Sequence, residues 1–236
     1  MQGISDPHPP PVIVLDNLVK FFGRFAALRG ISASFAPGRL YVVLGDNGAG
    51  KSTLLRIVAG LTEPSQGSLT LLGARRVRDV AHRFGYMGHA PLLYDELSGR
   101  ENLRYFAGLY GIHNDEAGRE AMGMVGLDPD LSRRVGQYSQ GMRQRLSLAR
   151  AVLHHPELML LDEPFSNVDV HSARAMAAVL GQLRDQGKTI FVVTHQAALM
   201  EAVADEWVHM AAGQIVNREP VLRGAAAADS GLRSAR

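Results

Sequence analysis

The segment GDNGAGKST, residues 45–53, combines three glycines, a lysine and two hydroxyl side chains directly after the apolar run LYVVL. Glycines, which lack a side chain, would let successive backbone N–H groups curl around phosphate oxygens. A helix beginning near Lys51 would point the positive end of its dipole at the same anion. Lys51 would then contact the terminal phosphates, and the Ser52 hydroxyl would ligate Mg²⁺. A flexible turn is the simpler explanation, but the strand before the loop and the helix after it favour nucleotide binding. The predicted nucleotide-binding residues are Gly45, Asp46, Asn47, Gly48, Ala49, Gly50, Lys51, Ser52 and Thr53.

A pair of acids, Asp162 and Glu163, follows a second apolar run, LMLL at 158–161. Side chains at the carboxyl end of a parallel strand lie where ligands of α/β proteins bind. Taken alone, Asp162 reads as an ordinary helix cap, but adjacent acids repel each other unless a cation or a proton shares the site. Beside a phosphate loop, Asp162 fits the Mg²⁺ shell and Glu163 fits the general base that polarises water.

A second helix start suited to anions is predicted in SQGMRQRLSLARAVLHH, residues 139–155. One apolar face, at helical spacing, predicts that this helix packs against other elements. The face is formed by Met142, Leu146, Ala149 and Leu153. Ser139 as the N-cap, with Gly141 in the first turn, would also present backbone N–H groups to an anion. Either the chain binds two anions, or two copies of it share each one.

The elements that must position these side chains read as strands alternating with helices. Strand patterns occur at VIVLDNLVKFF, LYVVL, LMLL and TIFVVT, SLTLLG reads as an edge strand, and WVHM and QIV around Gly213 predict a hairpin. A short helix is expected over 51–59 and a crossover helix over 172–186. Residues from about 95 to 155 read as helices without a convincing strand. Together these patterns predict an α/β fold with a mainly parallel sheet and an inserted helical region.

Bulk composition excludes several other classes. The 236 residues carry a formal net charge of +2, too little to indicate a nucleic acid as partner. The chain has no cysteine, which excludes disulfides and thiolate metal sites. No apolar run reaches the roughly 18 residues that cross a bilayer, and the start MQGISDPHPPP lacks the apolar stretch of a signal peptide. A role at a membrane would therefore need another protein to span it.

In their order over about residues 12–217, the motifs resemble those of the nucleotide-binding subunits of ATP-binding cassette (ABC) transporters. GDNGAGKST is similar to the Walker A loop, LMLLDE to Walker B, YSQGM to the signature motif, SNVD to the D-loop and THQ to the segment of the switch histidine. Each motif other than Walker A is modest evidence alone, whereas the ordered set is very specific. The resemblance implies a P-loop NTPase fold, with an ABC-type ATPase core, a small antiparallel β subdomain and an inserted helical subdomain.

The resemblance also implies roles for particular residues. Two subunits would pair head to tail, with each ATP between one Walker A loop and Ser139–Gly141 of the other subunit. His195 would contact the γ-phosphate, although alone it reads as a strand-end histidine without a ligand. Asp169 would carry communication between the paired sites. Phe22 matches the aromatic residue that stacks on adenine, and a core strand residue is the alternative. The implied catalytic residues are Lys51, Glu163 and His195, and the implied Mg²⁺ ligands are Ser52 and Asp162.

Two positions depart from the family pattern. Gln140 replaces the first glycine of the signature motif. No glutamine occurs over residues 67–136, where the family places the Q-loop glutamine that couples the site to the membrane partner. His89 or Ala90 fills that position, and an imidazole at His89 would be neutral or cationic depending on pH. Of the roles that the resemblance implies, coupling of the nucleotide site to the membrane partner is therefore the one that this sequence supports least.

The function implied is an ATPase that binds ATP and Mg²⁺, dimerises with a second copy or a paralogous subunit, and drives an integral membrane permease. Its location would be cytoplasmic, on the inner face of the cell membrane. The stretch GHAPLLYDELSGRENLRYFAGLYG, residues 88–111, is similar to exporter ATPases, especially the haem-exporter subunit of cytochrome c maturation. A non-transport ATPase of this family, for example one for cluster assembly, is the alternative. A degenerate regulator would need a broken catalytic set, which this chain does not have.

The expected domain organisation has three parts. Residues 1–11, rich in proline, would form a flexible lead-in. Residues 12–218 would form the ATPase domain, with the helical subdomain over about 95–155. Residues 219–236, rich in small side chains, would form a disordered tail.

Overall fold

The computed structural model describes residues 9–221, in which strands and helices alternate as an α/β protein requires. Of the expected lead-in at 1–11, residues 1–8 lie outside the described residues. The last strand ends at Pro220, so regular structure reaches into the tail expected to begin at residue 219. The rest of that tail, from residue 222, lies outside the described residues.

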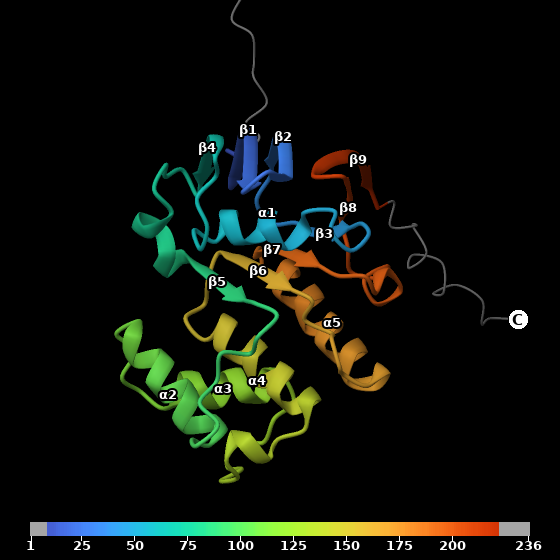
Figure 1. Cartoon of the computed structure of the whole chain (residues 1–236). Coiled ribbons are helices and arrows are strands. Elements are labelled where there is room, and N and C mark those ends of the chain that lie inside the picture. The colour runs from blue at the N-terminus through green and yellow to red at the C-terminus, as the bar shows by residue number, and fades with distance from the viewer. Residues whose placement is uncertain (1–8, 222–236) are drawn as a thin grey trace, which may run out of the picture.

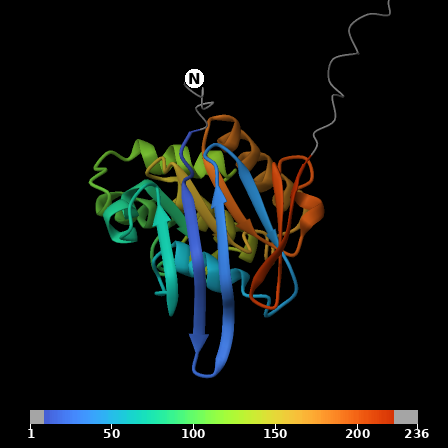
Figure 2. The same cartoon turned by 90° about the horizontal axis from the view of Figure 1, so that it is seen from above.

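Three antiparallel strands form the smaller sheet, seen as long ribbons in Figure 2. They are β1 (Ile13–Phe22), β2 (Phe25–Phe35) and β4 (Gln66–Leu71), in the order β2-β1-β4. Strand β4 lies at the edge, as the pattern SLTLLG predicts. The expected small antiparallel β subdomain is thereby confirmed.

Six strands form the larger sheet, in the order β5-β6-β7-β3-β8-β9. They are β3 (Leu40–Leu44), β5 (Phe84–Met87), β6 (Leu158–Asp162), β7 (Thr189–Val193), β8 (Glu206–Ala211) and β9 (Gln214–Pro220). All neighbours pair in parallel except β8 and β9, which form the predicted hairpin. Every residue of β6 and β7 is buried, which explains why both read as continuous apolar runs. Sequence patterns did not identify β5, which has four residues and is too short for a recognisable period.

Helix α1 (Lys51–Val58) lies between the two sheets (Figure 1). Its buried side chains Leu54 and Leu55 pack with Tyr41 and Val43 of β3. Val42, which lies between these two residues in β3, faces the other side of the larger sheet, because successive side chains of a strand point in opposite directions. Strand β3 thus separates two hydrophobic cores, and α1 belongs to the one between the sheets.

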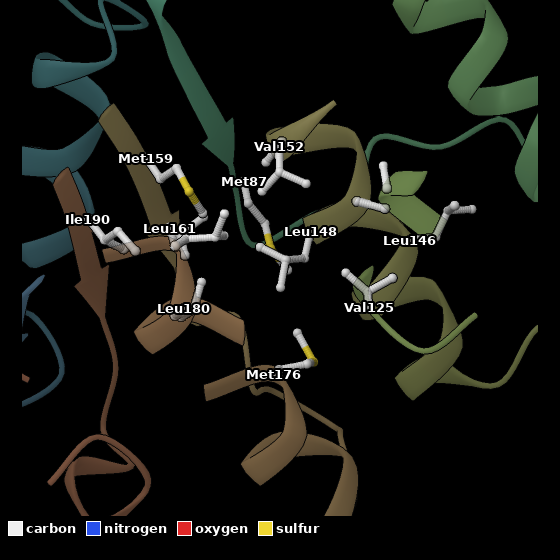
Figure 3. Packing of buried hydrophobic residues seen from close by; sticks show 14 of the residues in the cluster. Met87, Val125, Leu146, Leu148, Val152, Met159, Leu161, Met176, Leu180 and Ile190 are labelled. Carbon is white, nitrogen blue, oxygen red and sulfur yellow. The ribbon is translucent and has the colours of Figure 1, made fainter. Parts of the chain in front are cut away.

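On the opposite face of the larger sheet, α4 (Gln140–Val152) and α5 (Val170–Asp185) pack against the strands. Helices α2 (Gly99–Leu109) and α3 (Glu116–Met124) pack against α4, farther from the sheet (Figure 1). Figure 3 shows Leu148 and Val152 of α4 beside Met87 of β5, with Leu161 of β6 close by. The 3₁₀ turns are η1 (Val77–Arg83), η2 (Val135–Gln137) and η3 (Ala197–Leu199). The inserted helical part of the expected fold is confirmed. Within residues 9–221, no helix combines the length and apolar character needed to cross a membrane.

Replacing Gly85 of β5 by alanine is expected to destabilise the protein. The added Cβ would lie 2.0 Å from the backbone oxygen of Ala151 in α4, so the helix would have to move off the strand. We expect the free energy of unfolding, measured with urea, to fall by about 1–3 kcal/mol. Gly108→Ala in α2 is the matched control, because its Cβ would meet nothing within 4 Å. That variant should gain about 0.5–1 kcal/mol from helix propensity. Equal effects of the two substitutions would contradict this packing.

Candidate functional site

The loop between β3 and α1 holds the predicted nucleotide-binding residues, and backbone contacts shape it. Gly45 has φ 150° and Gly50 has φ 97°, values that side-chain-bearing residues rarely adopt. A Cβ on Gly45 would lie 2.1 Å from the carbonyl oxygen of Met210 in β8. One on Gly50 would lie 2.6 Å from the carbonyl oxygen of Ala27 in β2. Glycine is therefore required at both positions for the loop to fit between the two sheets.

The β8–β9 turn supports the loop from behind. Gly213 donates its N–H to the carbonyl of Ala49 (3.1 Å), and its own carbonyl accepts from the N–H of Arg29 in β2 (2.9 Å). In the described part of the chain, the N–H groups of Asn47 and Gly48 donate to no protein atom, so they are free for an anion. The supporting role of Gly213 did not follow from the sequence, where this glycine marked only a hairpin.

Lys51 lies at the start of α1 and folds back over the loop. Its Nζ donates to the carbonyl oxygens of Gly45 (2.6 Å) and Asp46 (3.0 Å). The side chain is buried, so its charge is concentrated at the loop. This is the place where phosphate oxygens would need a cation.

Ser52 and Asp162 meet although 110 positions separate them: the Ser52 hydroxyl donates to Oδ1 of Asp162 at 2.9 Å. Asp162 is 4% exposed, and this burial raises the pKa of its carboxyl group. The hydrogen bond from Ser52 lowers the pKa, whereas the neighbouring charge of Glu163 raises it further. A buried carboxylate and a hydroxyl are hard oxygen donors that suit Mg²⁺. Within residues 9–221, no group of three or more His, Asp or Glu side chains could hold a metal by itself. The pair therefore fits a magnesium ion whose other ligands come from phosphates and water.

Glu163 and His195 also come together, as predicted. Nδ1 of His195 lies 3.0 Å from Oε2 of Glu163. The backbone of Glu163 has φ 50°, in the left-handed region, which costs a non-glycine residue about 1 kcal/mol or more. Its N–H donates to the carbonyl of Val193 in β7 (2.8 Å), so the strand that leads to His195 also holds the Glu163 peptide.

The second predicted helix start is present, but on another layer. Ser139 is the N-cap of α4, and its hydroxyl accepts a hydrogen bond from the N–H of Met142 (3.2 Å). Ser139 is exposed, and Gly141 is half-buried. Helix α4 packs in the core on the helical side of the larger sheet, whereas α1 packs in the core between the sheets. Within one chain, five predicted site residues come together: Lys51, Ser52, Asp162, Glu163 and His195. Ser139 and Gly141 belong to a helix that packs on the other face of the larger sheet.

Three further residues have positions that the sequence did not settle. Phe22 is 53% exposed at the end of β1, so the alternative of a core strand residue is wrong. Asp169 is the N-cap of α5, and its carboxylate accepts a hydrogen bond from the N–H of Ser172. This hydrogen bond lowers the pKa of Asp169. His89 is exposed, and the positive charge of its protonated form lowers the pKa of Asp162.

Asp162→Asn is expected to stabilise the nucleotide-free protein. Because burial raises the Asp162 pKa, the ionised carboxylate disfavours the folded state once the pH rises through that value. The amide oxygen of the variant still accepts from Ser52, and the charge is gone. Calorimetry should show a higher unfolding temperature near neutral pH, by about 2–4 °C for each kcal/mol gained, and a smaller gap at acidic pH. Hydrolysis supported by Mg²⁺ should be lost in the same variant. A lower unfolding temperature at neutral pH would contradict the burial effect.

Comparison with known proteins identifies the family. The sequence pattern of the family described as "ABC transporter" matches residues 28–166. The ABC transporter ATP-binding protein NatA of Bacillus subtilis is 36% identical over 199 residues, which cover 81% of each chain. The bacitracin transport ATP-binding protein BcrA of Bacillus licheniformis is 32% identical and covers 89% of this chain and 70% of its own. A solved dimeric ATP-binding cassette, in a post-hydrolysis state with ADP and phosphate, superposes with a TM-score of 0.82 at 22% identity, over 89% of this chain and 99% of that one. The chain thus belongs to the ABC transporter family, as an ATP-binding subunit and an ABC-type ATPase.

Proposed function

We propose that two copies of this chain, or one copy and a paralogous subunit, close head to tail around two ATP molecules. The observation that carries this proposal is the placement of the two anion-binding helix starts, because α1 and α4 pack on opposite faces of one sheet. The exposed start of α4 at Ser139–Gly141 therefore meets the phosphates of its partner's ATP. The solved post-hydrolysis cassette with the same fold is itself a dimer. Phe22 is exposed at the end of β1, with Lys20 Nζ 5.2 Å from its ring centroid, and would stack on adenine.

Within each site, different residues of the chain would have different roles in hydrolysis. Loop amides and Lys51 would bind the phosphates, and Ser52 and Asp162 would hold Mg²⁺, which supplies charge neutralisation at the phosphates when bound. Glu163 accepts a proton from the attacking water. His195 orients the Glu163 carboxylate through Nδ1 and leaves Nε2 for the γ-phosphate. Asp169, at the start of α5, would carry communication to the paired site.

For transport, we propose that the ATPase works on a separate membrane subunit, at the cytoplasmic face of the membrane. Exposed apolar side chains gather on α2 and on the segment before it, which follows His89 in the sequence. They are Leu92, Tyr94, Tyr105 and Leu109, and the rings of Tyr94 and Tyr105 contact each other. Such a patch, unusual on an isolated domain, suits an apolar helix of a membrane subunit. The relatives named for bacitracin transport and for an ABC transporter support this role.

We propose export as the direction of transport, with haem or another molecule as cargo. Support for this finer assignment comes from the resemblance of residues 88–111 to exporter ATPases. A non-transport ATPase, for example in cluster assembly, is the competing function. Specific co-purification with a membrane protein encoded in a neighbouring reading frame would separate the two.

Glu163→Gln should leave ATP binding intact, reduce turnover by about 100-fold or more, and trap an ATP-bound dimer. The amide keeps the size of the side chain but cannot accept the proton of the attacking water. Phosphate release and size-exclusion chromatography with ATP and Mg²⁺ measure both effects. Glu157→Gln is the matched control, because Glu157 precedes β6, pairs with Arg83 and lies at the opposite end of the strand. Normal hydrolysis by Glu163→Gln would overturn the assignment of the base.

Leu109→Ser should weaken association with the membrane subunit by about tenfold, because Leu109, the last residue of α2, is 67% exposed and belongs to the proposed contact. Val216→Ser is the control, since Val216 is 60% exposed on β9, in a different part of the fold. Co-expression with the neighbouring membrane protein and affinity purification measure the association. Hydrolysis by the isolated ATPase should not change in either variant. Equal recovery of the membrane protein with both variants would refute the assigned contact.

A further inference from the structure

Gln144 connects α4, the helix that begins in the signature motif, to the peptide of Glu163, the proposed catalytic base. Its side chain is 5% exposed, and its Nε2 donates to the backbone carbonyl of Glu163 at 3.3 Å. A carbonyl can only accept, so this contact fixes which end of the amide faces Glu163. The other end, Oε1, is buried and has no hydrogen-bond partner among the described residues.

The Glu163 peptide is held from several elements at once. Its N–H donates to Val193 of β7, and its carbonyl accepts from the N–H of Ser166 (3.2 Å) as well as from Gln144. The residue also has a left-handed backbone at φ 50°, which persists only where surrounding contacts enforce it. The direction of the Glu163 carboxylate therefore depends on whether these contacts hold the peptide in place.

We propose that Gln144 is a positioning residue for ATP hydrolysis, which sets the Glu163 peptide according to the position of α4. Helix α4 begins at Ser139, so the helix start that meets the partner's ATP lies five residues from the amide that holds Glu163 in its own chain. Five residues of helix span about 7.5 Å, a distance over which a helix moves as a rigid body. Engagement of one ATP by α4 is thereby transmitted to the base at the other ATP. This inference rests on the head-to-tail pairing and on the role of Glu163 in the proposed function.

A purely structural role explains Gln144 less well. Burying an amide with one end unpaired is unfavourable compared with an apolar side chain of the same size. The core around α4 is apolar, with Leu146 and Leu148 among its buried residues. A residue chosen only for packing at this position would be apolar.

Gln144→Met tests the inference, because methionine keeps the volume and removes the donor. We expect kcat for ATP to fall about tenfold while KM changes less than about twofold. The unfolding midpoint in urea should stay the same or rise, since an unpaired buried amide is lost. Ser147→Ala is the matched control on the same helix, because the buried Ser147 hydroxyl donates to the carbonyl of Pro91 at 3.2 Å and not to Glu163. That variant should keep the native kcat.

A double-mutant cycle with Glu163→Gln separates positioning from a general disturbance. If Gln144 acts through Glu163, Gln144→Met should not lower the small residual rate of Glu163→Gln any further. Additive losses, or a native kcat in Gln144→Met, would overturn the inference while the role of Glu163 stands. A native rate in Glu163→Gln alone would instead overturn the proposed base. Should Gln144→Met fail to fold, Gln144→Leu is held to the same expectations.

Discussion

Close backbone contact between the phosphate loop and the two sheets is the constraint on which the rest of the site depends. Gly45 and Gly50 lie where any side chain would collide with carbonyl oxygens of Met210 and Ala27. Because β8 contacts the loop on one side and β2 on the other, α1 starts at a fixed point and in a fixed direction. Ser52 in its first turn then reaches Asp162 at the end of β6. A looser loop would separate the phosphate-binding amides from the carboxylates that complete the chemistry.

The two hydrophobic cores explain why one chain presents half of each site. Alternation along β3 sends Tyr41 and Val43 toward α1, and Leu40 and Val42 toward the helical layer. The larger sheet thus keeps the phosphate loop and the start of α4 on separate layers. The proposed pairing of two copies follows from this layering more directly than from any single motif.

Much of the site could be predicted because its parts are local in sequence or meet by a general rule. The phosphate loop is contiguous, and Asp162 and Glu163 follow a buried strand, whose carboxyl end in a parallel sheet faces the ligand. The surroundings could not be predicted in the same way. Gln144 reads as part of the polar face of an amphipathic helix, and its burial depends on a peptide in another segment.

Two further misses have local causes. Strand β5 has only four residues, so neither its period nor its bounds stood out. Strand β2 was not identified either, because irregular pairing with β1 breaks the regular alternation of buried and exposed residues along it.

The support of the loop by the β8–β9 turn has a consequence for biosynthesis. Strand β3 pairs with β7 and β8, and Gly213 donates to Ala49. All of these neighbours leave the ribosome long after the loop itself, so the first half of a nascent chain contains the nucleotide motif and β2 but lacks the contacts from Met210 and Gly213. Such distant pairing also slows folding. Chaperones that shield apolar strands would therefore meet this chain before ATP can.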